Sequence, residues 1–141
     1  MESMLLSARH PDIARPRVAL ADDDDLHSEV VATWLDLHGF DVVRFATGDA
    51  LLEWAQGEGA SAPVAAVLLD VEMPGRDGFA IYSELRRLQA FTPIPVLLVS
   101  GMSPDKLRAL ADAVTAPSMP KDGDLLPRLT EWLSRSACLA A

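Results

Sequence analysis

Short apolar runs alternate along this chain with segments in which apolar residues recur every three or four positions. The runs at residues 18–21, 64–69 and 96–99 are unbroken and bounded by polar residues or proline. Such runs are typical of strands buried on both faces of a parallel sheet. Residues 41–45 contain a β-branched valine pair and predict a further strand. Residues 118–120 predict a short last strand, so the pattern predicts five strands in all.

The segments between these strands have helical periodicity. In the first segment, four apolar residues form a stripe predicted to face the core: Leu26, Val30, Trp34 and Leu37. Asp24 or Asp25 would cap the start of that helix, and Gly39 would follow its end. Thr47 is predicted to open the second helix. The later helices are predicted to bury the following apolar residues: Ile81, Leu85, Leu88, Leu107, Leu110, Ala111, Val114, Leu125, Leu126, Leu129, Trp132 and Leu133.

Strands that alternate with helices in this way form βαβ units, whose right-handed crossovers produce a mostly parallel sheet. The sequence therefore predicts an α/β domain with a doubly wound, five-stranded parallel sheet and helices on both faces. This domain is predicted to span residues 17–136. Residues 1–16 are predicted to form a flexible tail, because Pro11 and Pro16 oppose regular structure, and residues 137–141 a second tail.

The composition narrows the classes of partner. A chain of 141 residues is the size of one domain. Its formal net charge of −9 repels nucleic acid phosphates and predicts no direct contact with nucleic acid. No apolar run approaches the ~20 residues that cross a bilayer, which predicts no membrane association. The single cysteine, Cys138, is compatible with a reducing cytoplasm, the expected location.

Polar side chains stand at the ends of the predicted strands. Asp22 and Asp23 follow the first strand, Asp70 the third, Ser100 the fourth and Lys121 the fifth. Singly, each has an ordinary structural explanation: an aspartate caps the next helix, a serine turns the chain, and a lysine is solvated. However, the carboxyl ends of parallel strands meet at one edge of a sheet, where open α/β sheets bind their ligands. These side chains are therefore expected to lie close together.

Three aspartates at one edge of a sheet predict a metal site. Crowded carboxylates repel one another, and burial raises their pKa values unless a cation neutralises them. Mg²⁺ suits such a cluster because it takes oxygen ligands from one or two carboxylates together with phosphate oxygens. With the ion in place, the Asp70 carboxylate could act as a nucleophile towards phosphorus. A lysine and a hydroxyl beside it would hold the transferring phosphoryl oxygens, so the edge is predicted to support phosphoryl transfer.

These residues, in this order and with MPGRDG behind Asp70, resemble the receiver domain of the response regulators of bacterial two-component systems. The matching pieces are the acidic pair Asp22 and Asp23, Asp70 within LLDVEMPGRDG, Ser100 after VLLV, and Lys121. The resemblance covers residues 17 to about 135. It implies a flavodoxin-like topology and a cytoplasmic signalling domain. Such a domain is not an enzyme beyond accepting and autocatalytically losing its own phosphoryl group.

The resemblance also implies a role for each site residue. Asp70 would accept a phosphoryl group from the phosphohistidine of a sensor histidine kinase or a phosphotransfer protein. The groups that would hold Mg²⁺ are Asp22, directly or through water, Asp23, Asp70 and the backbone carbonyl of Glu72. The Ser100 hydroxyl, the Gly101 amide and Lys121 would bind the phosphoryl oxygens. Phosphorylation would then change contacts with a downstream protein target.

Three features depart from the family pattern. Asp122 follows Lys121 where the family usually has a proline, which predicts a different shape for that loop. Ser118 stands where the family commonly carries an aromatic switch residue, so the usual coupling of the hydroxyl to an aromatic ring is in question. The segment TAPSMP is an unusual, proline-bearing last strand. None of these departures removes a residue implied in phosphorylation.

Other interpretations of the acidic residues remain. A small aspartate-nucleophile phosphatase of the haloacid dehalogenase type would use Asp22 and Asp24, but it leaves Asp70 unexplained. A protein-binding pseudo-receiver that no longer uses phosphorylation would accommodate the unusual segment around Ser118. An EF-hand loop fails, because His27 stands where the loop glycine is needed. The sequence ends after its fifth predicted helix, which predicts either a stand-alone receiver or one part of a longer protein.

Overall fold

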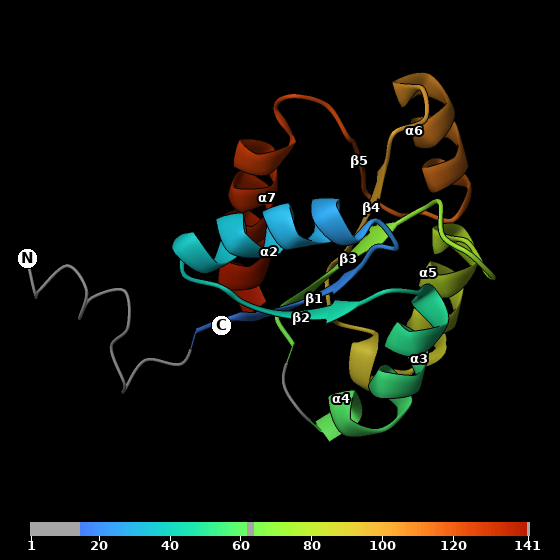
Figure 1. Ribbon diagram of the computed structural model, residues 1–141. Coiled ribbons are helices and arrows are strands. Elements are labelled where there is room, and N and C mark those ends of the chain that lie inside the picture. The colour runs from blue at the N-terminus through green and yellow to red at the C-terminus, as the bar shows by residue number, and fades with distance from the viewer. Residues whose placement is uncertain (1–14, 62–63, 141) are drawn as a thin grey trace, which may run out of the picture.

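The computed structural model describes residues 15–61 and 64–140 and arranges them as one sheet with helices on both faces (Figure 1). The strands are β1 (Arg17–Ala21), β2 (Asp41–Phe45), β3 (Ala66–Asp70), β4 (Val96–Ser100) and β5 (Ser118–Pro120). The helices are α2 (Asp25–Leu37), α3 (Gly48–Gln56), α4 (Glu58–Ser61), α5 (Gly78–Arg87), the 3-10 helix η1 (Gln89–Phe91), α6 (Pro104–Ala113) and α7 (Leu125–Ala140). The strand order is β2-β1-β3-β4-β5, and neighbouring strands are parallel. The predicted doubly wound five-stranded sheet, including its short last strand, is confirmed.

The strands send alternate side chains to opposite faces of the sheet, so each face has its own apolar core. In β1, Val18 and Leu20 pack towards α2 and α7, whereas Ala19 and Ala21 pack towards α3, α5 and α6. Figure 1 shows these two layers of helices with the sheet between them. Every residue of β3 and β4 is buried, as expected for strands in the middle of a parallel sheet.

Short polar side chains fix where the helices begin. The Asp24 carboxylate accepts a hydrogen bond from the His27 amide and caps α2, and the Thr47 hydroxyl accepts from the Ala50 amide and caps α3. Both caps agree with the sequence prediction. Gly39 follows α2 with a φ of +94°, a left-handed conformation that favours glycine after a helix end.

The prediction of which residues of the first helix face the core is wrong. Leu26, Val30 and Leu37 are 73%, 46% and 76% exposed, and only Trp34 of the predicted stripe packs against the core. The residues that α2 buries are Ser28, Val31 and Leu35. Apolar spacing does not identify this face, because one of its buried residues is the polar Ser28. The buried Ser28 hydroxyl accepts a 2.9 Å hydrogen bond from the Arg44 Nε.

One smaller prediction about a buried residue also differs from the structure. Leu110 of α6 was expected to be buried and is 40% exposed, while its neighbours Leu107 and Ala111 form the buried face. Helix α7 continues to Ala140, through residues 137–140 of the predicted second tail. Residues 1–14 of the predicted first tail lie outside the described residues, so the domain boundaries remain a prediction. In the part of the chain that is described, no helix is both long enough and apolar enough to cross a membrane.

Candidate functional site

The parallel sheet brings the predicted site residues to one edge. Asp70 is the last residue of β3 and Ser100 the last of β4, while Asp22 and Lys121 follow β1 and β5 directly. Backbone hydrogen bonds extend the ladders beyond the strands and fix these two positions. The Asp22 amide donates to the Phe45 carbonyl at 3.0 Å, and the Lys121 amide donates to the Ser100 carbonyl at 2.8 Å.

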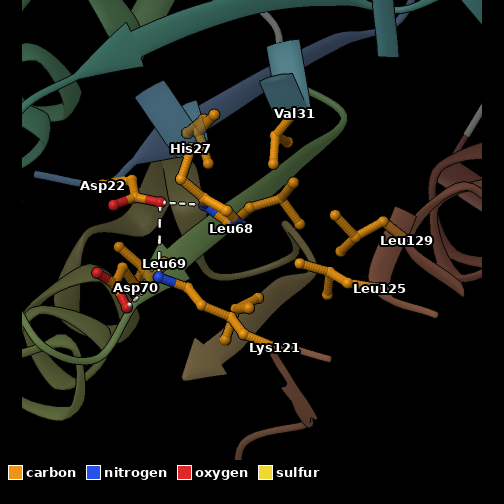
Figure 2. Close-up of a pocket in the computed structure, with 11 residues that line it drawn as sticks. Asp22, His27, Val31, Leu68, Leu69, Asp70, Lys121, Leu125 and Leu129 are labelled. Carbon is orange, nitrogen blue, oxygen red and sulfur yellow. Dashed lines mark hydrogen bonds and ion pairs between the residues drawn. The ribbon is translucent and has the colours of Figure 1, made fainter. Parts of the chain in front are cut away.

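Three carboxylates form a cluster at this edge. Oxygens of Asp22, Asp23 and Asp70 all lie within 4.8 Å of one another. Asp22 and Asp70 are 3% and 4% exposed, and Asp23 lies on the surface. The Lys121 Nζ lies 3.2 Å from Asp70 Oδ1 and 3.7 Å from Asp22 Oδ2, between the two buried aspartates (Figure 2). One ammonium group cannot balance three ionised carboxylates, so this set of oxygen ligands suits a divalent cation.

Burial makes Asp70 an unusually weak acid for an aspartate. Loss of hydration is the largest effect, and together with the neighbouring Asp22 it raises the pKa of Asp70 from 3.8 to about 6. The Lys121 ammonium and the Glu72 amide act in the opposite direction. Ionised Asp70 is therefore costly in the protein alone, and a bound cation would favour the ionised form.

The Ser100 hydroxyl is engaged by Glu72. It is fully buried and donates a 2.9 Å hydrogen bond to the Glu72 carboxylate, while it accepts one of 3.1 Å from the Met102 amide. Glu72 was predicted to act through its backbone carbonyl, and the sequence did not indicate this side-chain contact. A side chain added at the exposed Gly101 would meet no atom within 4 Å, so the backbone there is accessible.

A second residue that sequence reasoning missed is His27, on the first turn of α2. Its Nδ1 lies 2.7 Å from Asp22 Oδ2 (Figure 2). The only signal in the sequence is that a histidine follows the acidic end of the first strand within a few residues. Asp24, which the phosphatase interpretation required beside Asp22, uses its carboxylate to cap α2 instead.

Asp122, which departs from the family pattern, stabilises the loop after Lys121 through hydrogen bonds. Asp122 Oδ1 accepts hydrogen bonds from the Asp124 amide at 3.0 Å and from Arg128 at 2.6 Å. The bond from the Asp124 amide is the largest of the effects that lower the pKa of Asp122, and Arg128 adds to it. These contacts hold the loop by hydrogen bonds, where a proline would hold it by a rigid ring.

Known proteins resemble this chain in sequence and in structure. The family description of the response regulator receiver domain matches residues 18–117. The regulatory protein VanRc of Enterococcus gallinarum is 30% identical over 108 residues, which are 74% of this chain and 45% of that protein. This chain spans about half or less of the length of the curated relatives it matches.

Solved receiver structures superpose on nearly the whole fold. The chemotaxis protein CheY4 of Vibrio cholerae has a TM-score of 0.74 and 26% identity, covering 87% of this chain and 99% of that one. The receiver domain of the sensor histidine kinase PA1611 of Pseudomonas aeruginosa has a TM-score of 0.76 at 18% identity, covers 89% of this chain and 99% of its own, and carries magnesium in its active site cleft. The chain belongs to the receiver domain family of two-component response regulators.

Proposed function

We propose that this chain accepts a phosphoryl group on Asp70, in a Mg²⁺-dependent reaction, from the phosphohistidine of a histidine kinase or a phosphotransfer protein. The observation that carries the proposal is the geometry around one carboxylate. Buried Asp70 has the Lys121 ammonium 3.2 Å away and shares its cluster with Asp22 and Asp23. This arrangement provides a nucleophile, a fixed positive charge and oxygen ligands for a cation at one point.

In the proposed reaction, a carboxylate oxygen of Asp70 attacks the phosphorus. The P–N bond to the donor histidine breaks, and its electron pair returns to the imidazole nitrogen. The Lys121 ammonium neutralises charge on the phosphoryl oxygens. Ser100 would exchange its hydrogen bond to Glu72 for one to the phosphoryl group, and the Gly101 amide would donate to another oxygen. Positioning and neutralisation of charge are the main requirements of phosphoryl transfer.

Mg²⁺ fits the residues present. Asp22, Asp23, Asp70 and the Glu72 carbonyl would hold it, and they supply the hard oxygen ligands that this ion prefers. The bound ion would supply charge neutralisation for the transferring phosphoryl group. The metal dependence of phosphorylation tests this ligand set.

The proposed output is a change in protein contacts. A phosphoryl group brings about −1.5 to −2 charges to a buried edge of the sheet. Moving a switch from mostly off to mostly on requires ~5.5 kcal/mol of preference between its two states. We infer that breaking the hydrogen bond between Ser100 and Glu72 is the structural change that accompanies phosphorylation. We propose a downstream protein as the target, with no direct nucleic acid contact and no catalytic turnover, in the cytoplasm.

The test is phosphorylation by a small donor. Incubation with phosphoramidate or acetyl phosphate and Mg²⁺ should add one phosphoryl group, detected by intact mass and lost on treatment with hydroxylamine. Asp70→Asn and excess EDTA should each abolish the gain. Equal labelling of Asp70→Asn, or no labelling of the wild type, would contradict the proposal. Repeated turnover of a phosphate ester that depends on Asp22 but not on Asp70 would favour a phosphatase instead.

A further inference from the structure

His27 makes a contact that the receiver motif does not explain. Its Nδ1 lies 2.7 Å from Asp22 Oδ2, and the side chains are 28% and 2% exposed. An ionised carboxylate can only accept hydrogen bonds, so when Asp22 is ionised the imidazole is the donor of this contact, through Nδ1–H. His27 is therefore a fixed hydrogen-bond donor to a member of the acidic cluster.

Both oxygens of Asp22 are held from the start of α2. Oδ2 accepts from His27, and Oδ1 accepts a 2.9 Å hydrogen bond from the Asp24 amide. Two donors on separate oxygens define the plane of a carboxylate and leave its remaining lone pairs in set directions. The orientation of Asp22 towards Asp23 and Asp70 thus depends on His27.

The same contact bears on Lys121. Its Nζ is closer to Asp70, at 3.2 Å, than to Asp22 Oδ2, at 3.7 Å. Without the imidazole, Oδ2 would have the ammonium as its remaining partner, and closer pairing there would draw Lys121 away from Asp70. His27 occupies the oxygen that would otherwise compete for the lysine (Figure 2).

We propose that His27 is a positioning residue of this site. Its Nδ1–H holds Asp22 in the orientation that ligates the cation and leaves Lys121 directed at Asp70. His27 acts through Asp22 and touches neither the phosphoryl donor nor the acceptor. The proposal rests on the proposed function, because it requires the acidic cluster to bind Mg²⁺. Partners that orient metal ligands typically contribute about 10- to 100-fold in metal affinity or activity.

Packing is the competing explanation. The ring lines a small pocket together with Val31, Leu68 and Leu129, and an apolar side chain would fill that space equally well. Two variants separate the explanations. His27→Leu keeps an apolar side chain and removes the donor, whereas His27→Asn loses the ring but keeps an N–H close to the position of Nδ1. His38→Leu is the matched control, because His38 lies at the other end of α2 with its Nδ1 on the Trp34 carbonyl.

The experiment measures Mg²⁺ affinity of the full chain by isothermal titration calorimetry near pH 7.5. His27→Leu should weaken binding about tenfold, while His27→Asn and His38→Leu should stay within about threefold of the wild type. Wild-type affinity in His27→Leu, or an equal loss in His27→Leu and His27→Asn, would overturn the role of His27. Absence of Mg²⁺ binding by the wild type would instead overturn the proposed function.

A second measurement needs no variant. Imidazole ¹⁵N NMR of the wild-type chain distinguishes the two neutral tautomers of histidine. Protonation of His27 at Nδ1 is expected, because the Asp22 carboxylate accepts from that atom. The tautomer protonated only at Nε2 would overturn the proposal, even where His27→Leu fails to fold.

Discussion

Burial of Asp70 disfavours the ionised carboxylate that the proposed reaction requires. Its pKa of about 6 in the folded protein lies above its ordinary value of 3.8, so the folded state binds this proton more tightly than the unfolded state does. The resulting stabilisation is present below about pH 3.8 and is lost as the pH rises through about 6. Above that range the wild-type protein carries a destabilising charge.

We therefore expect Asp70→Asn to stabilise the metal-free protein near neutral pH. The amide has no charge to bury, so the gain in unfolding free energy over the wild type should be roughly 2 kcal/mol larger at about pH 7.5 than at about pH 4. Urea unfolding in EDTA at both values measures it. Taking the difference between the two proteins cancels the titration of the other carboxylates. An equal difference in unfolding free energy between the two proteins at both pH values would contradict the expectation.

The hydrogen bond between Ser100 and Glu72 is expected to oppose the proposed phosphorylation. Ser100 must leave the Glu72 carboxylate before it can serve a phosphoryl oxygen, and a hydrogen bond to a charged acceptor is worth roughly 1.5–3 kcal/mol. Glu72→Ala should therefore tighten binding of beryllofluoride, a phosphoryl mimic, about tenfold in the presence of Mg²⁺. Glu72→Gln retains an acceptor and should show a smaller gain. Weaker binding by Glu72→Ala would indicate that Glu72 assists the phosphorylated state.

At the scale of one element, α2 exposes apolar side chains next to the site. Leu26 is 73% exposed and lies in the first turn of α2, three residues after Asp23 in the chain, and Val30 follows one turn later. In the proposed reaction, a donor protein approaches this edge to deliver its phosphoryl group to Asp70. Exposed apolar residues beside an active site are suited to contact with a partner protein.

Leu26→Glu should slow phosphotransfer from a donor protein about tenfold, because a charge would be buried in the contact. Labelling by phosphoramidate and the thermal stability should both stay close to wild type, since Leu26 is on the surface. Leu37→Glu is the matched control: Leu37 is equally exposed but lies eleven residues along the helix, about 16 Å away. The assay uses any histidine kinase that labels the wild-type chain. Unfolding of Leu26→Glu, or equal slowing by both variants, would contradict this assignment.

Some helices and strands could be predicted from the sequence more fully than others. Strands such as β3 and β4 were predictable because continuous apolar runs have few other stable placements, and the caps at Asp24 and Thr47 because their side chains satisfy a purely local requirement. The buried face of α2 was not predictable from apolar spacing. Its orientation is set by packing against β1 and α7, and the buried Ser28 becomes favourable only through Arg44, sixteen residues away.

For the whole molecule, topology explains why the site itself was predictable. A parallel sheet collects the ends of β1, β3, β4 and β5 at one edge, so strand order places Asp70 and Lys121 at the same edge, where the lysine side chain reaches Asp70. Contacts such as His27 with Asp22 depend on side-chain rotamers and loop paths. Those are fixed only once the complete fold is formed, and no local pattern in the sequence specifies them.

Because the acidic cluster is assembled only in the folded chain, Mg²⁺ should stabilise the entire domain. A ligand that binds only the folded state at a hundredfold excess over its Kd adds about 2.7 kcal/mol, which corresponds to a rise in Tm on the order of 5–10 °C for a chain of this size. A bound cation would relieve repulsion among Asp22, Asp23 and Asp70, so its effect should be larger near pH 7.5, where Asp70 is ionised, than near pH 5.

Differential scanning calorimetry with and without MgCl₂, at constant ionic strength set by KCl, measures this rise. Asp23→Asn is the control variant, because Asp23 is on the surface and its replacement should leave the metal-free Tm nearly unchanged while removing one negative charge from the cluster. Its response to Mg²⁺ should fall well below that of the wild type. An equal response in the two proteins, or an equal rise with KCl alone, would mean that general screening of the −9 charge stabilises the domain and that the cluster holds no specific ion.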